Sequence, residues 1–245
     1  MALIWGRHPI VEALRANRSI DRIMLAEGAK PSGLIAELLQ RAGERGIRIQ
    51  RVDRQVLDRL AEGANHQGVV AEVAEYLYRT LDDVVQLGKQ SERLPLVLAL
   101  DALEDPQNFG TLLRTADAVG ATAAIIPFHR SVGVTPSVAK SSAGAVEYLP
   151  IARVINLGRA LDELKENGYW IVGLDLTGTT RYCDAPVDVP LVLVVGSEER
   201  GLGHVVSKSC DVLVKLPMSG HLESLNAAVA GSIVLFDVWR RRGFR

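Results

Sequence analysis

Apolar and polar positions over the first 75 residues follow the periods of short helices and strands. The segment 9–17 predicts a short helix with Pro9 in its first turn, where a missing N–H is tolerated. Short apolar runs predict strands, and longer amphipathic runs predict the helices between them. The expected strands are 21–26, 47–52 and 67–75, and the other expected helices are 31–45 and 53–61. The pattern predicts a small, compact α/β unit.

From residue 94 onward the pattern changes to buried strands that alternate with helices. Residues 96–100 are a continuous apolar run that ends at Asp101, as expected of a strand covered on both faces. Strand–helix alternation of this kind predicts a mainly parallel sheet. Further strands are expected at 122–126, 148–151, 170–175, 190–195 and 211–216, and a long helix at 225–241 closes the chain.

Between these two patterns the periodicity is lost. The segment 77–94 contains the polar run 88–93 and predicts an interdomain linker, with a turn of helix within 80–87 as the alternative. The expected organisation is a small α/β domain over 1–76, the linker, and a larger α/β domain over 95–245. A length of 245 residues suits one small and one medium domain.

Composition narrows the class of protein. The chain is 48% hydrophobic and 23% charged, as in soluble globular proteins, and no apolar run reaches the roughly 18–20 residues of a membrane span. The N-terminus lacks a signal-peptide core, so we expect a cytoplasmic protein that does not enter a membrane. Cys183 and Cys210 are too few and too far apart for a disulfide framework or a zinc knuckle. The histidines show no ligand spacing, so no metal site is expected.

The distribution of charge says more than the net charge of −1. Residues 1–59 contain 11 Lys and Arg against 7 Asp and Glu, and 10 of those 11 are arginines. Guanidinium groups match phosphate geometry, so this part of the chain has the charge of an RNA-binding surface. Charge alone equally fits a solvated surface of ion pairs.

Three polar segments follow predicted strands, and ligands of open parallel sheets bind beyond the carboxyl ends of the strands. In the first segment, 101–114, we expect Asn108 to cap a helix, Gly110 to permit a close approach, and Arg114 to lie on the first turns of that helix. A capped helix with a surface arginine is the alternative reading of this segment.

The second segment, 196–203, is bracketed by glycines and contains Glu198. It differs from a phosphate-binding P-loop because Leu202-Gly203 stands where a P-loop has Lys followed by Ser or Thr. No G-x-G-x-x-G follows a strand either, which removes the main support for nucleoside triphosphate and dinucleotide binding. We expect Gly196 to leave space that a ligand needs, although a plain turn would have the same composition.

The third segment, 216–226, leads into the last predicted helix. Ser224 is expected to be the N-cap of that helix, with Asn226 in its first turn. The helix is apolar nearly all round, with Val229, Ile233 and Phe236 among its apolar positions. Such a helix should be buried, and a second subunit is one way to bury it.

Together and in this order, the three segments resemble the motifs of the SpoU (TrmH-type) RNA 2′-O-ribose methyltransferases of the SPOUT superfamily. These motifs read N-x-G-x-x-x-R, then an apolar strand ending in G-x-E-x-x-G, then L/I-P-M-x-G…S-L-N. The run 6–14 (Gly-Arg-His-Pro-Ile-Val-Glu-Ala-Leu) and the run 65–69 (Asn-His-Gln-Gly-Val) are similar to the motifs of the family's small N-terminal RNA-binding domain. The combination resembles the 23S ribosomal RNA guanosine 2′-O-methyltransferase (RlmB) branch.

The resemblance implies a parallel-sheet catalytic domain with a deep trefoil knot, S-adenosyl-L-methionine as cofactor, ribosomal RNA as partner, a homodimer, and no DNA. Arg114 would be either the general base for the ribose hydroxyl or a fixed cation that orients a phosphate, because a guanidinium normally stays protonated. The implied cofactor contacts are Gly196, Leu216 and Leu225, and the implied catalytic residues are Asn108, Arg114, Glu198, Ser224 and Asn226.

The chain departs from the family's pattern at one position. Ribosomal members often read S-L-N-V-S, whereas this chain has Ala227 and Ala228 after Asn226 and therefore lacks that hydroxyl. Two alternatives remain at this stage. A tRNA 2′-O-methyltransferase is disfavoured by the separate arginine-rich domain, and a non-catalytic RNA-binding member of the fold is disfavoured by the retained motif residues.

Overall fold

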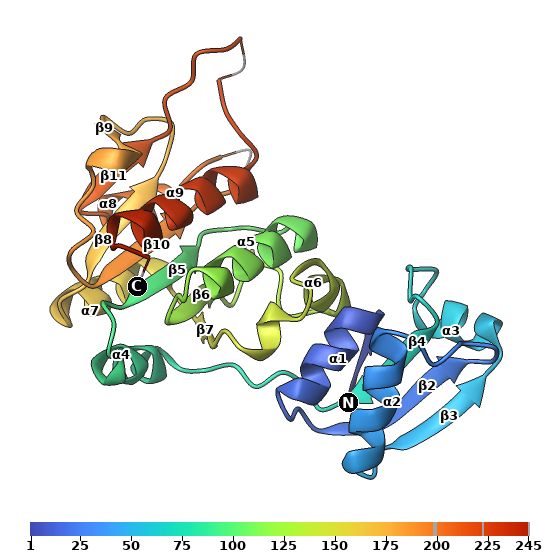
Figure 1. The fold of residues 1–245 in the computed structure, drawn as a ribbon. Coiled ribbons are helices and arrows are strands. Elements are labelled where there is room, and N and C mark those ends of the chain that lie inside the picture. The colour runs from blue at the N-terminus through green and yellow to red at the C-terminus, as the bar shows by residue number, and fades with distance from the viewer. Residues whose placement is uncertain (198–199, 222, 245) are drawn as a thin grey trace. The chain divides into compact units, whose positions relative to one another are not determined.

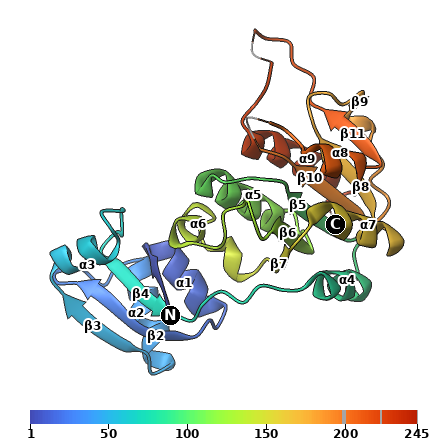
Figure 2. The same cartoon turned by 180° about the vertical axis from the view of Figure 1, so that it is seen from behind.

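The computed structural model describes residues 1–197, 200–221 and 223–244 (Figures 1 and 2). The chain divides into two compact units. The first unit consists of Met1–Leu77 and Val134–Tyr148, and the second of Tyr78–Gly133 and Leu149–Arg245. None of the helices within the described residues combines the length and the hydropathy of a membrane-spanning segment. The described residues also contain no group of three His, Cys, Asp or Glu side chains placed to hold a metal ion.

The first unit is built on a four-stranded sheet with the strand order β1-β4-β2-β3. Strands β1 and β2 both pair antiparallel with β4, and β2 pairs parallel with β3. The short N-terminal strand β1 was not predicted, because four residues are too few to show a period. The elements are β1 (Ala2–Trp5), α1 (Arg7–Arg15), β2 (Ile20–Ala26), α2 (Leu34–Glu44), β3 (Arg48–Val52), α3 (Arg54–Leu60) and β4 (Val69–Val73).

A later segment of the chain completes the first unit. It contains the short helix α6 (Pro136–Ser141) and the 3-10 turn η1 (Ala145–Glu147). Glu147 in this segment forms a largely buried ion pair with Arg18 at 2.7 Å. Burial raises the pKa of the Glu147 carboxyl, and the Arg18 guanidinium opposes that rise.

The prediction of a strand at 148–151 is wrong in its bounds, because the strand β7 occupies Ile151–Val154 and shares only residue 151 with it. Tyr148 instead belongs to the first unit, where its hydroxyl donates to Glu12 Oε2 at 2.6 Å. The hydrogen bond to Glu12 therefore holds Tyr148 in the first unit, although the local sequence pattern around Tyr148 predicts a strand.

The second unit contains a seven-stranded sheet in which every pair of neighbouring strands is parallel, as the alternating pattern predicted. The strand order is β7-β6-β5-β10-β8-β11-β9. The other elements of this unit are α4 (Leu81–Gln90), β5 (Leu96–Leu100), α5 (Pro106–Ala118), β6 (Ala123–Pro127), α7 (Leu157–Glu166), β8 (Trp170–Leu174), β9 (Thr180–Arg181), η2 (Tyr182–Asp184), β10 (Leu191–Val195), α8 (His204–Lys208), β11 (Val212–Lys215) and α9 (Ala227–Arg241).

Helices cover both faces of this sheet, which explains why its central strands are apolar along their whole length. On one face, Val97 and Val192 belong to a buried cluster with residues of α4, α7 and α8. On the other face, α5 and α9 pack against each other, and a Cβ placed on Gly231 of α9 would lie 2.7 Å from Leu112 of α5 and 3.1 Å from Val195 of β10. Figure 1 shows these two helices side by side.

The predicted linker contains a longer helix than the single turn considered from the sequence. Thr80 caps α4 by accepting from the backbone N–H of Asp83, and the Asp83 carboxylate accepts from the backbone N–H of Thr80. This reciprocal capping box stabilises the start of the helix. The domain limits 1–76, 77–94 and 95–245 stay a prediction, as does the trefoil knot.

Candidate active site and cofactor cavity

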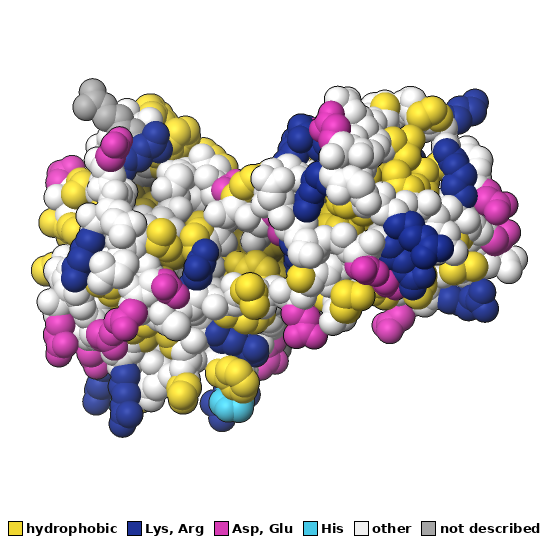
Figure 3. Space-filling model, turned by 90° about the horizontal axis from the view of Figure 1, so that it is seen from below, with side chains coloured by type: hydrophobic (Ala, Val, Ile, Leu, Met, Phe, Trp, Pro, Cys, Tyr) yellow, Lys and Arg dark blue, Asp and Glu magenta, His cyan; other side chains and the backbone are white. Residues whose placement is uncertain are grey.

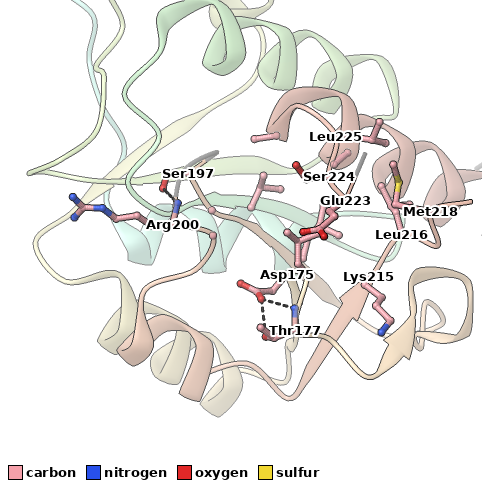
Figure 4. Close-up of a pocket in the computed structure, with 17 residues that line it drawn as sticks. Asp175, Thr177, Ser197, Arg200, Lys215, Leu216, Met218, Glu223, Ser224 and Leu225 are labelled. Atoms are coloured by element: carbon pink, nitrogen blue, oxygen red, sulfur yellow. Dashed lines mark hydrogen bonds between the residues drawn. The ribbon is translucent and has the colours of Figure 1, made fainter. Parts of the chain in front are cut away.

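A cavity of about 300 Å³ lies at the carboxyl ends of β8, β10 and β11, three adjacent strands of the large sheet. We call it the cofactor cavity. Its wall is formed by the loops that follow these strands and by the start of α9, so segments far apart in sequence meet there (Figure 4). Residues labelled in that view are Asp175, Thr177, Ser197, Arg200, Lys215, Leu216, Met218, Glu223, Ser224 and Leu225.

Gly196 lines this cavity, but the reason for a glycine differs from the predicted one. The chain returns over residue 196, with Gly201 N–H donating to the Ser197 carbonyl at 2.9 Å and Ser197 N–H donating to the Gly201 carbonyl at 3.2 Å. A Cβ on Gly196 would lie 2.2 Å from the Gly201 carbonyl oxygen. The loop's own backbone therefore excludes a side chain at this position before any ligand does.

Two carboxylates hold the returning loop in place. Asp101, at the end of β5, accepts from Gly203 N–H at 2.7 Å, and Asp175, at the end of β8, accepts from Leu202 N–H at 3.1 Å. Asp175 also accepts from the backbone N–H and the hydroxyl of Thr177, as Figure 4 shows. Partial burial opposes the charge of Asp175, but these hydrogen bonds outweigh it and lower the pKa of the carboxyl.

Asp175 is a site residue that sequence reasoning missed. Polar functional segments are predicted after only three of the strands, although 170–175 is also predicted as a strand. The same rule applied there would have found Asp175 and Thr177, because both follow the carboxyl end of a strand in the same parallel sheet.

The amide side chains of Asn108 and Asn226 meet at the N-termini of two packed helices. Asn226 Nδ2 donates to Asn108 Oδ1 at 3.0 Å. Asn226 Oδ1 accepts from the backbone N–H groups of Ala228 and Val229, at 3.0 and 3.1 Å. The Asn226 side chain therefore caps α9 and also bridges to α5. Because Asn108 is buried, this bridge is held in place.

Both predicted helix caps are corrected by this arrangement. Asn226, and not Ser224, is the N-cap of α9, since the helix starts at Ala227. Asp105, and not Asn108, is the N-cap of α5, where its carboxylate accepts from Gln107 N–H at 3.0 Å and Asn108 N–H at 3.3 Å. Asn108 lies within the first turn, which directs its side chain to Asn226. Several good capping residues stand close together in both segments, and the packing of α5 on α9 selects among them.

The remaining predicted catalytic residues occupy different surroundings. Ser224 is exposed and lines the cavity. Arg114 is exposed on α5 about 120° around the helix axis from Asn108, and it makes no hydrogen bond or ion pair with any other residue that the structure describes. Glu198 lies outside the described residues. The geometry brings Gly196, Leu216, Ser224 and Leu225 together at one cavity and leaves Arg114 on the surface of a neighbouring helix.

Comparison with known proteins places this site in a class. Residues 95–236 match the SpoU rRNA Methylase family, and residues 3–79 match the family described as RNA 2′-O ribose methyltransferase substrate binding. YacO of Bacillus subtilis (strain 168), named as a TrmH family tRNA/rRNA methyltransferase, is 44% identical over 98% of this chain and 95% of its own length. A Staphylococcus haemolyticus protein named in the same way is 45% identical, covering 98% of this chain and 96% of its own.

Solved structures agree with these sequence matches. The SpoU methyltransferase AviRb from Streptomyces viridochromogenes, crystallised with AdoMet (S-adenosylmethionine), has a TM-score of 0.81 at 26% identity, covering 99% of this chain and 91% of its own. An AdoMet-bound rRNA methyltransferase from Sinorhizobium meliloti has a TM-score of 0.81 at 26% identity, covering 98% and 87%. Fold and site together define an S-adenosylmethionine-dependent RNA methyltransferase.

The chain belongs to the SpoU (TrmH) family of RNA methyltransferases. Its cofactor is S-adenosyl-L-methionine, and the chemistry of the cavity wall fits that molecule. Leu216 and Leu225 offer an apolar surface for an adenine ring. The carboxylates of Asp175 and Glu223 offer partners for positive charge, and the cationic side chains of Arg200 and Lys215 offer partners for a carboxylate. A wall of mixed character suits a ligand that carries an aromatic ring, two cationic groups and one anionic group.

Proposed function

We propose that this enzyme transfers a methyl group to the ribose 2′-hydroxyl of a guanosine in 23S ribosomal RNA. The observation that carries the proposal is the meeting of the segments after β8, β10 and β11 at the cofactor cavity, with the Asn108–Asn226 bridge anchoring the helix that completes its wall. The match of residues 3–79 to a substrate-binding domain of RNA 2′-O ribose methyltransferases supports the ribose as acceptor.

The residues of the cavity would hold the cofactor by its ring and its charged end. Gly196, Leu216 and Leu225 line the cavity and would contact it. When bound, S-adenosylmethionine supplies a methyl group already activated by its sulfonium. The protein's task is therefore alignment of the acceptor oxygen and removal of its proton. Ser224 would shape the reactive end of the cavity, and the Asn108–Asn226 pair would fix the start of α9 beside it.

Arg114 and Glu198 would position the RNA that carries the acceptor hydroxyl. Guanidinium groups match phosphate geometry, so Arg114 in the exposed surroundings described above serves better as a fixed cation for an RNA phosphate than as a base. Arg114 could take up a proton from the hydroxyl only where a second subunit or the RNA buried it and disfavoured its charge. Glu198 would position or polarise Arg114 or Asn108.

A homodimer is part of this proposal. Val229, Ile233 and Phe236 share one side of α9 and are 47%, 37% and 46% exposed, at a spacing that forms a continuous apolar stripe. We assign a second copy of this chain to that stripe, because burial of these exposed apolar side chains against a partner subunit would stabilise the helix next to the cavity. The stripe continues to Leu225, which lines the cavity and is itself 39% exposed.

The proposal is tested by incubating the purified protein and labelled S-adenosylmethionine with 23S ribosomal RNA and, separately, with tRNA, both taken from a strain that lacks the protein. Mapping of 2′-O-methyl groups should show one new guanosine site in the ribosomal RNA and none in tRNA. A new site in tRNA alone would replace the ribosomal substrate. Binding of the cofactor without methyl transfer to either RNA would indicate a non-catalytic RNA-binding protein.

A further inference from the structure

A second cavity, of about 600 Å³, lies wholly within the first unit, far along the chain from the cofactor cavity. We call it the arginine pocket. It is formed where the two N-terminal motifs singled out in the sequence, 6–14 and 65–69, come together. Its polar lining residues are Arg7, His8, Glu27, Arg54 and Gln67.

Direct hydrogen bonds join the two motifs at this pocket. The backbone N–H of Arg7 donates to Gln67 Oε1 at 3.1 Å, and Arg7 Nε donates to the Gln67 carbonyl at 3.2 Å. These bonds occupy one edge of the Arg7 guanidinium and the oxygen of the Gln67 amide. No described residue accepts from the terminal nitrogens of Arg7 or from Gln67 Nε2, so these groups can donate to an anion or to the edge of a base.

A buried histidine fixes the loop that carries Gln67. His66 is 2% exposed, and its Nδ1 accepts from Gly68 N–H at 3.0 Å. Its other nitrogen, Nε2, therefore carries the proton and donates to Asp58 Oδ1 at 2.9 Å. Gln67 is held at φ 54°, in the left-handed region that non-glycine residues rarely adopt. Strain held in place by a buried side chain is characteristic of loops that present a group to a ligand.

Four of the ten arginines in the first unit are neutralised by glutamates, and the two arginines of the pocket are not, within the part of the chain that the structure describes. Arg15, Arg18, Arg22 and Arg41 each form an ion pair with a glutamate. Arg7 and Arg54 of the pocket have no carboxylate partner among the described residues, and neither does the pocket's His8. Glu27 is the one carboxylate in the described lining. Two arginines without a carboxylate partner against one carboxylate in the described lining leave the pocket a local excess of positive charge, and this excess attracts phosphate.

We propose that the arginine pocket binds one nucleotide of single-stranded RNA, with its phosphate on Arg7 and Arg54 and its base or ribose beside the Gln67 amide. The volume suits a nucleotide, and guanidinium groups bind phosphate through paired N–H donors. Single-stranded RNA is favoured over a duplex because only an unpaired nucleotide can enter a pocket. The inference rests on RNA being the substrate, as in the proposed function.

Charge-removal variants of the full-length protein test this proposal. Arg7→Ala keeps the backbone N–H bond to Gln67 Oε1 and removes the guanidinium together with its bond to the Gln67 carbonyl, and Arg54→Ala removes the second cation. Arg48→Ala and Arg59→Ala are matched controls, since both arginines are exposed in the same unit, lie outside the pocket and have no carboxylate partner in the part of the chain that the structure describes. Thermal melting of each variant verifies that it is folded.

The measurements are the Kd for ribosomal RNA, kcat and KM for methyl transfer, and the Kd for S-adenosylmethionine. Each pocket variant should raise the RNA Kd and KM by about tenfold, as expected for one lost charge-assisted contact, with kcat and cofactor affinity unchanged. The controls should change RNA affinity by less than about threefold. Pocket variants that behave like the controls, in an enzyme that methylates RNA, overturn the pocket alone. A wild-type protein that methylates no RNA overturns the proposed function instead.

Discussion

The two cavities of this protein differ in the chemistry of the side chains that line them. The arginine pocket is lined by arginines that have no carboxylate partner among the described residues. The cofactor cavity has leucines on its wall, and Asp101 and Asp175 hold its loop through hydrogen bonds. On the face shown in Figure 3, basic and acidic side chains are interspersed, so charge is not gathered into one broad surface there. From this difference we expect RNA affinity to depend on local charge in the arginine pocket, and methyl transfer to depend on backbone loops held in fixed positions.

The largest effect is expected at Asn226, where the two functions of one side chain are separable. Asn226→Ala removes the cap of α9 and the bond to Asn108, whereas Asn226→Asp keeps the cap and replaces the Nδ2 donor to Asn108 with a carboxylate oxygen. Both variants should lower kcat by about 100-fold, because a misplaced reacting group costs this much. Only the alanine variant should also lower Tm. An aspartate variant with normal kcat would show that the bridge to Asn108 is dispensable.

Gly196→Ala should come next. The added Cβ would lie 2.2 Å from the Gly201 carbonyl oxygen, so the loop must move and the cavity must change shape. We expect S-adenosylmethionine affinity, measured by calorimetry, to fall by more than about tenfold while RNA affinity is kept, since a displaced loop costs its hydrogen bonds. Gly220→Ala is the control, because a Cβ there meets nothing within 4 Å. Equal cofactor affinity in both variants would contradict the loop's role.

The apolar stripe on α9 provides a third test. Phe236→Asp should convert a dimer into a monomer, as measured by sedimentation at micromolar concentration, because a buried charge without a partner opposes association. Ile155→Asp is the control, since Ile155 is 90% exposed elsewhere in the second unit and has no proposed partner. A wild-type protein that sediments as a monomer would remove the dimer from the account.

The smallest expected effect concerns pH. The folded-state pKa of Asp175 is lowered, so its contribution to stability is present above the ordinary pKa near 3.8 and is lost as the pH falls through the lowered value. Asp175→Asn should lower Tm by about 2–4 °C at pH 7, as for a loss near 1 kcal/mol, and the two melting curves should converge in acid. A difference in Tm that persists unchanged at low pH would assign the effect to packing and not to charge.

Much of the second unit was predictable because buried parallel strands leave an unmistakable apolar run, as at β5 and β10. The motif segments were also found from sequence, since polar residues at strand ends stand out against such runs. The helix caps were wrong because packing between α5 and α9 decided among several candidates. The place of 134–148 in the first unit could not be predicted, because it depends on contacts such as Arg18 with Glu147, 129 residues apart.

The most direct test of the central claim replaces a single oxygen in the substrate. Once the methylated guanosine is mapped, a ribosomal RNA fragment containing that nucleotide is made in two forms, one with the ribose and one with 2′-deoxyribose at that position alone. We predict single-turnover methyl transfer to the ribose form and none to the deoxy form, with equal binding of both. Equal methyl transfer to the two forms would place the methyl group elsewhere on the nucleotide and contradict the account.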